Sequence, residues 1–203
     1  NCNGIIIPGG FGNRGINGML LVAQFCREKN IPILGICLGM HIMCIEAARQ
    51  IYGFSCNSEE FEADAKHLII SIVNDDNKDM GGTMKLGLHK TYLTKSNNGS
   101  LTTAYKCYSD IECEQKKDIE YIYERHRHRY EVNPKYREDL SSKLFFSGKD
   151  AEEQCIDIVE ITNHKFYIGC QYHPEFQSHL HKPSPLFNGL VKTCLKNPIV
   201  NII

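Results

Sequence analysis

The fold is decided by the stretch Ile31-Pro-Ile-Leu-Gly-Ile-Cys-Leu-Gly-Met-His-Ile-Met-Cys-Ile-Glu-Ala-Ala-Arg-Gln50. Its apolar run from Ile31 to Ile36 predicts a buried strand, and the apolar spacing from Met40 to Gln50 predicts a helix. Only residues 35 to 39, Gly-Ile-Cys-Leu-Gly, carry the turn between the two. A chain that turns so sharply has no room for Cβ atoms beside the turning residue, and the glycines on either side of Cys37 meet this requirement. The pattern therefore indicates a nucleophile elbow with a cysteine at its tip.

Cys37 is open to two interpretations from this pattern alone. At the tip of an elbow its sulfur stands clear of the sheet, near the amides of the first helical turn, which favour a negative charge. Such a thiol is suited to nucleophilic catalysis. Most free cysteines, however, are packed inside a core as small apolar residues. The choice therefore depends on a partner elsewhere in the chain.

Length and composition are those of a single globular domain. The chain has 203 residues, a formal net charge of −1 and 42% apolar residues, so it favours neither a nucleic-acid nor a membrane partner. Its ten cysteines form no Cys-x-x-Cys pair, and several lie in apolar runs. This usage predicts reduced thiols in a cytoplasmic protein, with neither a disulfide framework nor a metal site.

The first part of the chain repeats the order strand, loop, helix. Residues 5 to 7 (Ile-Ile-Ile) predict a strand, the loop from Pro8 to Gly12 is rich in glycine, and residues 16 to 29 have the spacing of an amphipathic helix. With the elbow that follows, they predict an open, mostly parallel α/β sheet flanked by helices. In such sheets the site lies at the carboxyl ends of the strands. The glycine loop fits either a phosphate cradle or a tight turn.

Short strands are predicted in the rest of the chain, and some of them are expected to form a small antiparallel subsheet. Their ranges are 68–73, 80–87, 88–93, 102–108, 155–161 and 165–171. Residues 184–196 predict a last amphipathic helix. Because the first buried strand begins almost at the first residue, we expect the chain to be an N-terminally truncated piece of a longer polypeptide.

Residues 124 to 131, Glu-Arg-His-Arg-His-Arg-Tyr-Glu, form the densest polar cluster of the sequence. On a strand, alternation places the three arginines on one face and the two histidines on the other. A guanidinium that points into a pocket binds a carboxylate through two parallel hydrogen bonds. A solvated basic face fits the same composition. The flanking Glu124 and Glu131 and the near-neutral charge of the chain argue against a nucleic-acid patch.

A histidine and a glutamate flank a proline in Cys170-Gln-Tyr-His-Pro-Glu-Phe176. The proline keeps His173 extended, so that Glu175 can contact one imidazole nitrogen while the other faces outward. With Cys37 these residues make a nucleophile, a base and an orienting carboxylate in the order Cys, His, Glu. The alternative for His173, one of nine histidines, is an ordinary loop position.

Six motifs, taken in order, resemble those of the glutamine amidotransferase domains of CTP synthases. They are Pro8-Gly-Gly-Phe-Gly12, Gly35-Ile-Cys-Leu-Gly-Met40, Asn57-Ser-Glu-Glu-Phe61, Gly81-Gly-Thr-Met-Lys-Leu-Gly87, Glu124-Arg-His-Arg-His-Arg-Tyr-Glu-Val-Asn133 and Cys170-Gln-Tyr-His-Pro-Glu-Phe176. The Gly-x-Cys-x-Gly and His-Pro-Glu elements are shared by triad glutaminases in general, whereas the Arg-His-Arg-His-Arg run and Gly-Gly-Thr-Met are narrower. The resemblance spans nearly the whole chain and implies the class I glutamine amidotransferase fold, which is flavodoxin-like.

The resemblance implies that the domain hydrolyses the side-chain amide of glutamine through a γ-glutamyl thioester. Cys37 is then expected to attack the carboxamide carbon. His173 is expected to accept the thiol proton and return it to the departing ammonia, and Glu175 to orient His173. The amides of Leu38 and Gly10 are expected to form the oxyanion hole.

Substrate contacts are implied by the same resemblance. Glu60 is expected to bind the α-ammonium of L-glutamine and Arg129 its α-carboxylate. Gly39, Met40 and His41 follow the nucleophile and are expected to line the substrate site. The family usually has a glutamine where this chain has His41, so the sequence departs from the pattern at this position.

Partners outside this chain are implied as well. Residues 1–203 correspond to a glutaminase domain that needs no cofactor or metal of its own. The ammonia is expected to pass to a synthetase (amidoligase) domain of the same polypeptide, absent from this chain, which uses ATP and magnesium to convert UTP to CTP. The full-length protein is expected to be a homotetramer. Rival hypotheses are another triad amidotransferase, a γ-glutamyl hydrolase, or a catalytically silent regulatory module of the same fold.

Overall fold

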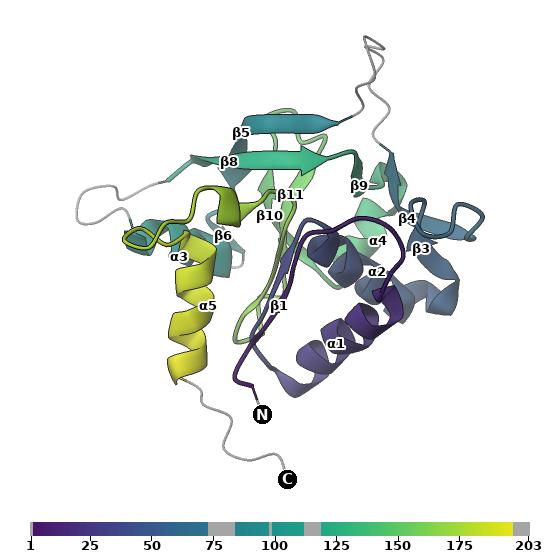
Figure 1. The fold of residues 1–203 in the computed structure, drawn as a ribbon, viewed down its shortest axis with the longest axis horizontal. Helices are drawn as coiled ribbons and strands as arrows, with labels where there is room; N and C mark the ends of the chain where they lie inside the picture. The colour runs from purple at the N-terminus through teal and green to yellow at the C-terminus, as the bar shows by residue number, and fades with distance from the viewer. Residues whose placement is uncertain (1, 73–83, 98, 112–118, 197–203) are drawn as a thin grey trace.

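The computed structural model describes residues 2–72, 84–97, 99–111 and 119–196 (Figure 1). Within this part, seven strands form one sheet in the order β1-β2-β12-β11-β10-β5-β8. Their bounds, in the order of the sheet, are β1 (Ile5–Ile7), β2 (Ile33–Ile36), β12 (Tyr167–Cys170), β11 (Ile156–Glu160), β10 (Phe145–Lys149), β5 (Lys85–Leu93) and β8 (Tyr121–His128).

The strands of this sheet run mostly in one direction. β1, β2 and β12 are parallel neighbours, and each of the four remaining pairs is antiparallel. β10 and β8 therefore point the same way as β12, and only β11 and β5 point the opposite way. Five of the seven strands share a direction, which confirms the predicted open, mostly parallel α/β sheet. The three parallel neighbours are the ones that carry the elbow and the His-Pro-Glu motif.

Two smaller sheets lie beside the main one. β3 (Cys56–Ser58), β4 (His67–Ile72) and β9 (Tyr130–Val132) form a three-stranded sheet. Its β3–β4 pair is parallel and its β4–β9 pair antiparallel, so the small subsheet predicted as antiparallel is in fact mixed. A short antiparallel pair is formed by β6 (Ser96–Asn97) and β7 (Ser100–Leu101).

Helices cover both faces of the main sheet (Figure 1). One face carries α1 (Ile16–Lys29), α2 (Leu38–Tyr52) and α4 (Arg137–Ser141), and the other carries α3 (Thr103–Ile111) and α5 (Pro185–Lys196). Single 3₁₀ turns are η1 (Gly53–Ser55), η2 (Pro134–Tyr136) and η3 (Pro174–Phe176). Two hydrophobic clusters result, one on each face, and the predicted helices α1, α2 and α5 are confirmed.

The helix α2 is the most deeply buried of these elements. Every residue from Leu38 to Ala48 is buried, because α2 packs against β2 and β12 of the main sheet, against α1, and against the sheet of β3 and β4. A helix enclosed in this way has no freedom to shift, so the residue at its N-terminus, Cys37, has a fixed position relative to the strands.

Residues 102–108, predicted as a short strand, instead begin the helix α3. Two acceptors stabilise its first turn. The carboxylate of Glu160 accepts hydrogen bonds from the amides of Thr103 and Ala104 at 2.9 Å each, and the hydroxyl of Thr102 accepts from the Tyr105 amide at 3.2 Å. These bonds satisfy amides that a helix leaves free at its N-terminus. Because Glu160 is remote in sequence, the local pattern could not reveal this cap.

Most of the other predicted strands are confirmed, and part of one falls outside the described residues. The strands predicted at 5–7, 68–73, 155–161 and 165–171 correspond to β1, β4, β11 and β12. The part of the 80–87 segment that lies before Met84 is outside the described residues. The nine cysteines in the described part are not joined in disulfides. No helix in that part has both the length and the hydrophobicity of a bilayer span.

The two glycines of the elbow lie at close contacts between backbones. A Cβ on Gly35 would come within 2.7 Å of the Gly39 carbonyl, and a Cβ on Gly39 would come within 2.3 Å of the Ile7 carbonyl oxygen in β1. The second contact is with the backbone of β1, the edge strand paired with β2, and a backbone has no rotamer by which it could move away. The predicted need for glycine at both positions is therefore met by two separate contacts.

We expect Gly39→Ala to lower the free energy of unfolding by about 1–3 kcal/mol, because the added methyl group collides with β1 in a closely packed region. Gly18→Ala is the matched control. Gly18 is exposed in α1, and no atom lies within 4 Å of the place that its Cβ would take, so alanine there should leave stability unchanged or raise it by up to about 1 kcal/mol. Urea denaturation of both variants tests this. Equal stabilities would contradict the close contact at Gly39.

Candidate active site

Cys37 lies between the end of β2 and the start of α2, with a strained backbone. Its φ of 51° and ψ of −101° are unusual for a residue with a side chain, and such conformations cost on the order of 1–3 kcal/mol. Two hydrogen bonds hold it there. Its amide donates to the Cys170 carbonyl of β12 at 2.7 Å, and its carbonyl accepts from the His41 amide at 3.1 Å. The elbow predicted from the sequence is therefore present, and it is attached to β12.

His173 follows β12 and is held by three contacts. Its amide donates to the Arg125 carbonyl of β8 at 2.8 Å. Its Nδ1 and the Glu175 Oε1 lie 2.5 Å apart, and its ring stacks on Phe176 with centroids 4.7 Å apart. Glu175 thus occupies Nδ1 and leaves Nε2 without a hydrogen-bond partner among the described residues, while Cys37 also interacts with the ring.

Gly9 provides the space in which Cys37 and His173 meet. A Cβ at Gly9 would lie 2.8 Å from Cε1 of His173 and 3.6 Å from Cβ of Cys37. Any side chain at this position would press on the imidazole. The glycine loop after β1 therefore serves the contact between Cys37 and His173, which assigns it a packing role that the motif alone left open.

The electrostatics of His173 favour a protonated ring. Burial of the imidazole opposes protonation, but the interactions with Cys37 and Glu175 outweigh burial and raise the pKa of His173 to about 9. Nε2 itself has no hydrogen-bond partner in the described part of the chain. At neutral pH the ring is therefore protonated, with the carboxylate of Glu175 against Nδ1 and Nε2 left open.

Neighbouring side chains also hold the glycine loop in place. A Cβ on Gly10 would lie 3.1 Å from the Leu38 side chain, so these two predicted oxyanion-hole residues are neighbours. The Gly12 amide donates to Glu60 Oε1 at 2.7 Å. The guanidinium of Arg127 lies 5.6 Å from the ring centroid of Phe11, within the range of a cation–π contact. Side chains of two other elements thus hold the loop.

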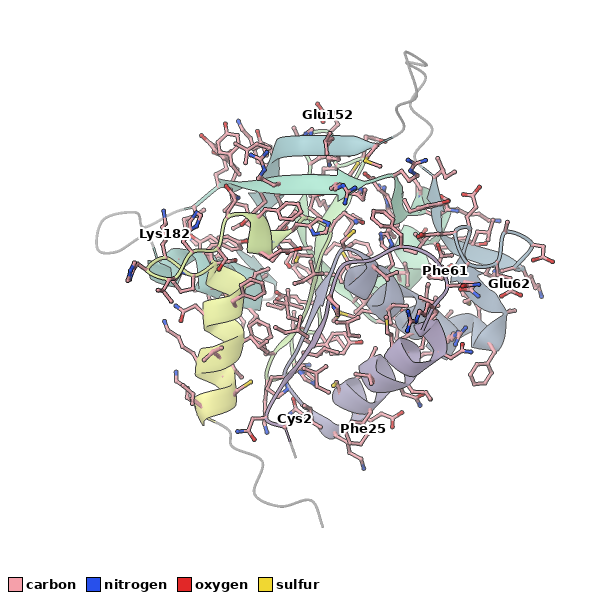
Figure 2. The ribbon with its side chains drawn as sticks, in the orientation of Figure 1. Cys2, Phe25, Phe61, Glu62, Glu152 and Lys182 are labelled. Carbon is pink, nitrogen blue, oxygen red and sulfur yellow. The ribbon has the colours of Figure 1, made fainter. Side chains whose placement is uncertain are left out.

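Glu60 and Arg129 lie around Tyr130. Burial raises the pKa of the Tyr130 hydroxyl, Glu60 and Glu59 raise it further, and Arg129 lowers it. A carboxylate and a guanidinium that both act on one hydroxyl suit the two charged groups of an amino acid. Phe61 and Glu62, the next residues in the Glu60 loop and both labelled in Figure 2, line a hollow at the start of α1.

The predicted alternation of the polar run is confirmed in β8. Arg125 and Arg127 are exposed, whereas His126 and His128 are buried. The two imidazoles lie 3.0 Å apart, between His126 Nδ1 and His128 Nε2. Burial and the neighbouring Lys85 lower the pKa of both histidines. The arginines are therefore the residues of this run that face outward near the glycine loop.

Packing inside the protein fixes the positions of three predicted site residues at the start of α2. Gly39 lies against Ile7, and Met40 lies against Gly169 in the core. His41 is buried, and its Nε2 lies 2.8 Å from the Gln171 Oε1. Burial lowers the pKa of His41 to about 4 even though the hydrogen bond with Gln171 favours protonation. Gly39 and Met40 can therefore contact a ligand only through the backbone.

Gln171 belongs to the site, although the sequence did not single it out. Its side-chain Nε2 donates toward Cys37 Sγ at 3.8 Å, and its backbone amide donates to the Asp157 carbonyl at 2.8 Å. It lies between β12 and His173 and is fully buried. The one feature of the sequence that could have pointed to Gln171 is its place in the Cys170–Phe176 motif, two residues before His173. No group of three or more His, Cys, Asp or Glu residues in the described part could hold a metal ion.

Comparisons with known proteins agree with this geometry. The family model described as glutamine amidotransferase class-I matches residues 1–193. The chain is 44% identical to a CTP synthase of Aquifex aeolicus over 198 residues, covering 96% of this chain and 35% of that protein. It is 45% identical to a CTP synthase of Treponema denticola, covering 98% and 35%. The chain thus spans about a third of the length of these relatives.

Solved structures lead to the same family. The glutaminase domain of a Trypanosoma brucei CTP synthase with bound acivicin superposes with a TM-score of 0.84 and 36% identity, covering 98% of this chain and 74% of that one. A glutamine amidotransferase of Thermotoga maritima matches in fold alone, at a TM-score of 0.51 and 12% identity over 96% of this chain and 76% of that one. The chain therefore belongs to the class-I glutamine amidotransferase family and, within it, to the glutaminase domains of CTP synthases.

Proposed function

We propose that Cys37, His173 and Glu175 hydrolyse the side-chain amide of L-glutamine to glutamate and ammonia. The observation that carries this proposal is the position of His173, whose Nδ1 is 2.5 Å from a carboxylate and whose ring lies with Cys37 around Gly9. A nucleophile, a base and an orienting group in contact are the features of a covalent acyl-transfer site.

Hydrolysis proceeds in two halves. The Cys37 sulfur, after its proton has passed to His173, attacks the carboxamide carbon and forms a tetrahedral intermediate. Amides of Gly10 and Leu38 stabilise the oxyanion, and a donor of this kind contributes typically about 2.7–4 kcal/mol. The C–N bond then breaks, and the proton from His173 leaves with ammonia. In the second half His173 takes a proton from water, the hydroxide attacks the γ-glutamyl thioester, and glutamate departs from the thiolate.

Glu60 and Arg129 select a free amino acid as the substrate. The carboxylate of Glu60 pairs with the α-ammonium, and the guanidinium of Arg129 pairs with the α-carboxylate. Glu60 also accepts the Gly12 amide, so the residue that binds the substrate is joined to the loop that carries Gly10. Support for this assignment comes from the charges around Tyr130. The ring of His41 is buried and bonded to Gln171, so we assign this residue no direct contact with the bound amino acid.

The ammonia is proposed to serve the synthesis of CTP. The related CTP synthases are about three times as long as this chain, so residues 1–203 are taken as a glutaminase domain whose partner is a synthetase domain of the same polypeptide. ATP, UTP and magnesium are assigned to that partner, and no cofactor to this domain. A homotetrameric full-length protein in the cytoplasm remains an expectation from the family resemblance.

We expect Cys37→Ala to reduce the turnover of glutamine by at least about a thousandfold, since no other group can form the thioester. The measurement is glutamate release by the full-length protein. Cys44→Ala is the matched control, because Cys44 is a buried thiol further along α2 that takes no part in the chemistry. It should keep the wild-type rate. Comparable rates for Cys37→Ala and wild type would refute the assignment of the nucleophile.

The pH profile of glutamine hydrolysis is expected to fall above pH about 9, where His173 loses the proton that the departing ammonia needs. Glu175→Gln removes the anion that favours this proton, so the pKa of His173 falls and the alkaline limb moves to lower pH. Glu152→Gln, a change of the same charge at an exposed residue (Figure 2), should leave the limb in place. An unmoved limb in Glu175→Gln would show that Glu175 does not act through His173.

Two variants of Glu60 separate its two contacts. Glu60→Gln keeps an oxygen that accepts the Gly12 amide but loses the charge, so KM for glutamine should rise about 10- to 100-fold with little change in kcat. Glu60→Ala loses both contacts and should lower kcat as well, because the Gly10 loop is no longer held. Glu62→Gln controls for a lost charge in the same loop. An unchanged KM in Glu60→Gln would exclude an ammonium contact.

A further inference from the structure

The Cys37 sulfur has a second polar neighbour besides His173. Nε2 of Gln171 donates toward Sγ at 3.8 Å, and Oε1 of the same amide lies 2.8 Å from Nε2 of His41. The two residues come from different elements, since His41 is in the first turn of α2 and Gln171 directly follows β12. They form a chain of hydrogen bonds from the imidazole through the amide to the sulfur.

The direction of these hydrogen bonds follows from the chemistry of the amide. An amide oxygen only accepts, so the His41 Nε2 that contacts it must carry the hydrogen. This fixes the other end of the amide, which presents its N–H group to Cys37. The imidazole of His41 remains neutral at neutral pH, because burial lowers its pKa to about 4. It therefore donates to Gln171 without adding a positive charge beside the nucleophile.

Burial excludes water from this chain of hydrogen bonds. Gln171 is fully buried and His41 is 3% exposed, so neither side chain can exchange its partner for solvent. The position of His41 is also fixed by its backbone amide, which donates to the Cys37 carbonyl at 3.1 Å. A buried amide with both ends bonded has one orientation, and the orientation found here directs a donor at the sulfur.

We propose that His41 and Gln171 are a positioning pair that holds an N–H donor against the Cys37 sulfur and so stabilises its anionic form. Gln171 acts on the sulfur directly, and His41 acts through Gln171 by fixing the orientation of the amide. The role for catalysis rests on the proposed glutaminase function, whereas the effect on the sulfur does not. On this basis His41, at a position where the family usually has a glutamine, serves the nucleophile instead of the substrate.

Four variants of the full-length protein test the pair. Gln171→Met removes the donor with little change in volume. Gln171→Glu keeps an oxygen for His41 but replaces the N–H group with an anion. His41→Leu leaves the amide without its fixed partner, and His41→Gln restores a donor to Oε1. His164→Gln is the control, because His164 is another buried histidine whose ring Nε2 is bonded to the Cys26 carbonyl, away from the elbow.

The first readout is the alkylation rate of Cys37 by iodoacetamide at pH 7.5, followed by mass spectrometry of the Cys37 peptide, which needs no glutamine. We expect this rate to fall roughly tenfold or more in Gln171→Met and Gln171→Glu, since a hydrogen bond to a charged group is lost. His41→Leu should give a smaller fall. His41→Gln should stay within about threefold of wild type through the restored donor, and so should His164→Gln.

The second readout separates positioning from substrate binding. In glutamine hydrolysis the Gln171 variants should lose kcat by about as much as they lose alkylation rate, with KM nearly unchanged. Wild-type alkylation in Gln171→Met, with melting temperature preserved, would overturn the proposal. A raised KM with unchanged kcat in His41→Leu would make His41 a substrate ligand and also overturn it. If wild type released no glutamate, the proposed function would fail while the alkylation result still judged the pair.

Discussion

The hydrogen bond from the Cys37 amide to the Cys170 carbonyl is the interaction on which the rest of the site depends. It continues the parallel pairing of β2 with β12 by one step beyond Cys170↔Ile36. Because the two strands are parallel neighbours, the residues that follow each of them emerge at the same edge of the sheet. The elbow from the early part of the chain and the His-Pro-Glu segment from the late part thus meet without a long loop from either side, and the strained backbone of Cys37 is held by a strand and a buried helix.

The two sides of the site differ in how firmly they are held. The nucleophile is attached to β12, to α2 and to the backbone contact between Gly39 and Ile7. The glycine loop is held mainly by two side-chain contacts, Glu60 with the Gly12 amide and Arg127 with Phe11. Both contacts lie among partly exposed residues, where each contributes little and is readily exchanged for water. Adjustment on substrate binding is therefore expected in the loop, while the sulfur stays in place.

Local sequence patterns predicted much of the fold, because the elements concerned are specified by their own residues. The elbow glycines, the spacing of α1 and the alternation in β8 each have a physical cause within a few residues. The helix α3 was missed because its cap, Glu160, comes from a distant strand. Gln171 was missed for a similar reason, since a glutamine in a strand-end motif gains its meaning only from the sulfur beside it. The proposed triad could be predicted from the sequence because its two motifs contain unusual residue combinations, whereas a single buried amide has no such signature.

His173 and Gln171 stabilise a negative sulfur by different means, and the difference matters for the chemistry. The imidazole can accept and return a proton, and its raised pKa shows that the surrounding charges favour the protonated form. An amide does not titrate in this range, so Gln171 can support the sulfur through every step without competing for the proton. The same holds for the neutral ring of His41, which is kept uncharged by burial. Because the sulfur has one neighbour that titrates, His173, and one that does not, Gln171, the thiolate stays available. All proton transfer then goes through His173. If both neighbours titrated, the proton would be shared between them, and no single group would be the acid that protonates the departing ammonia.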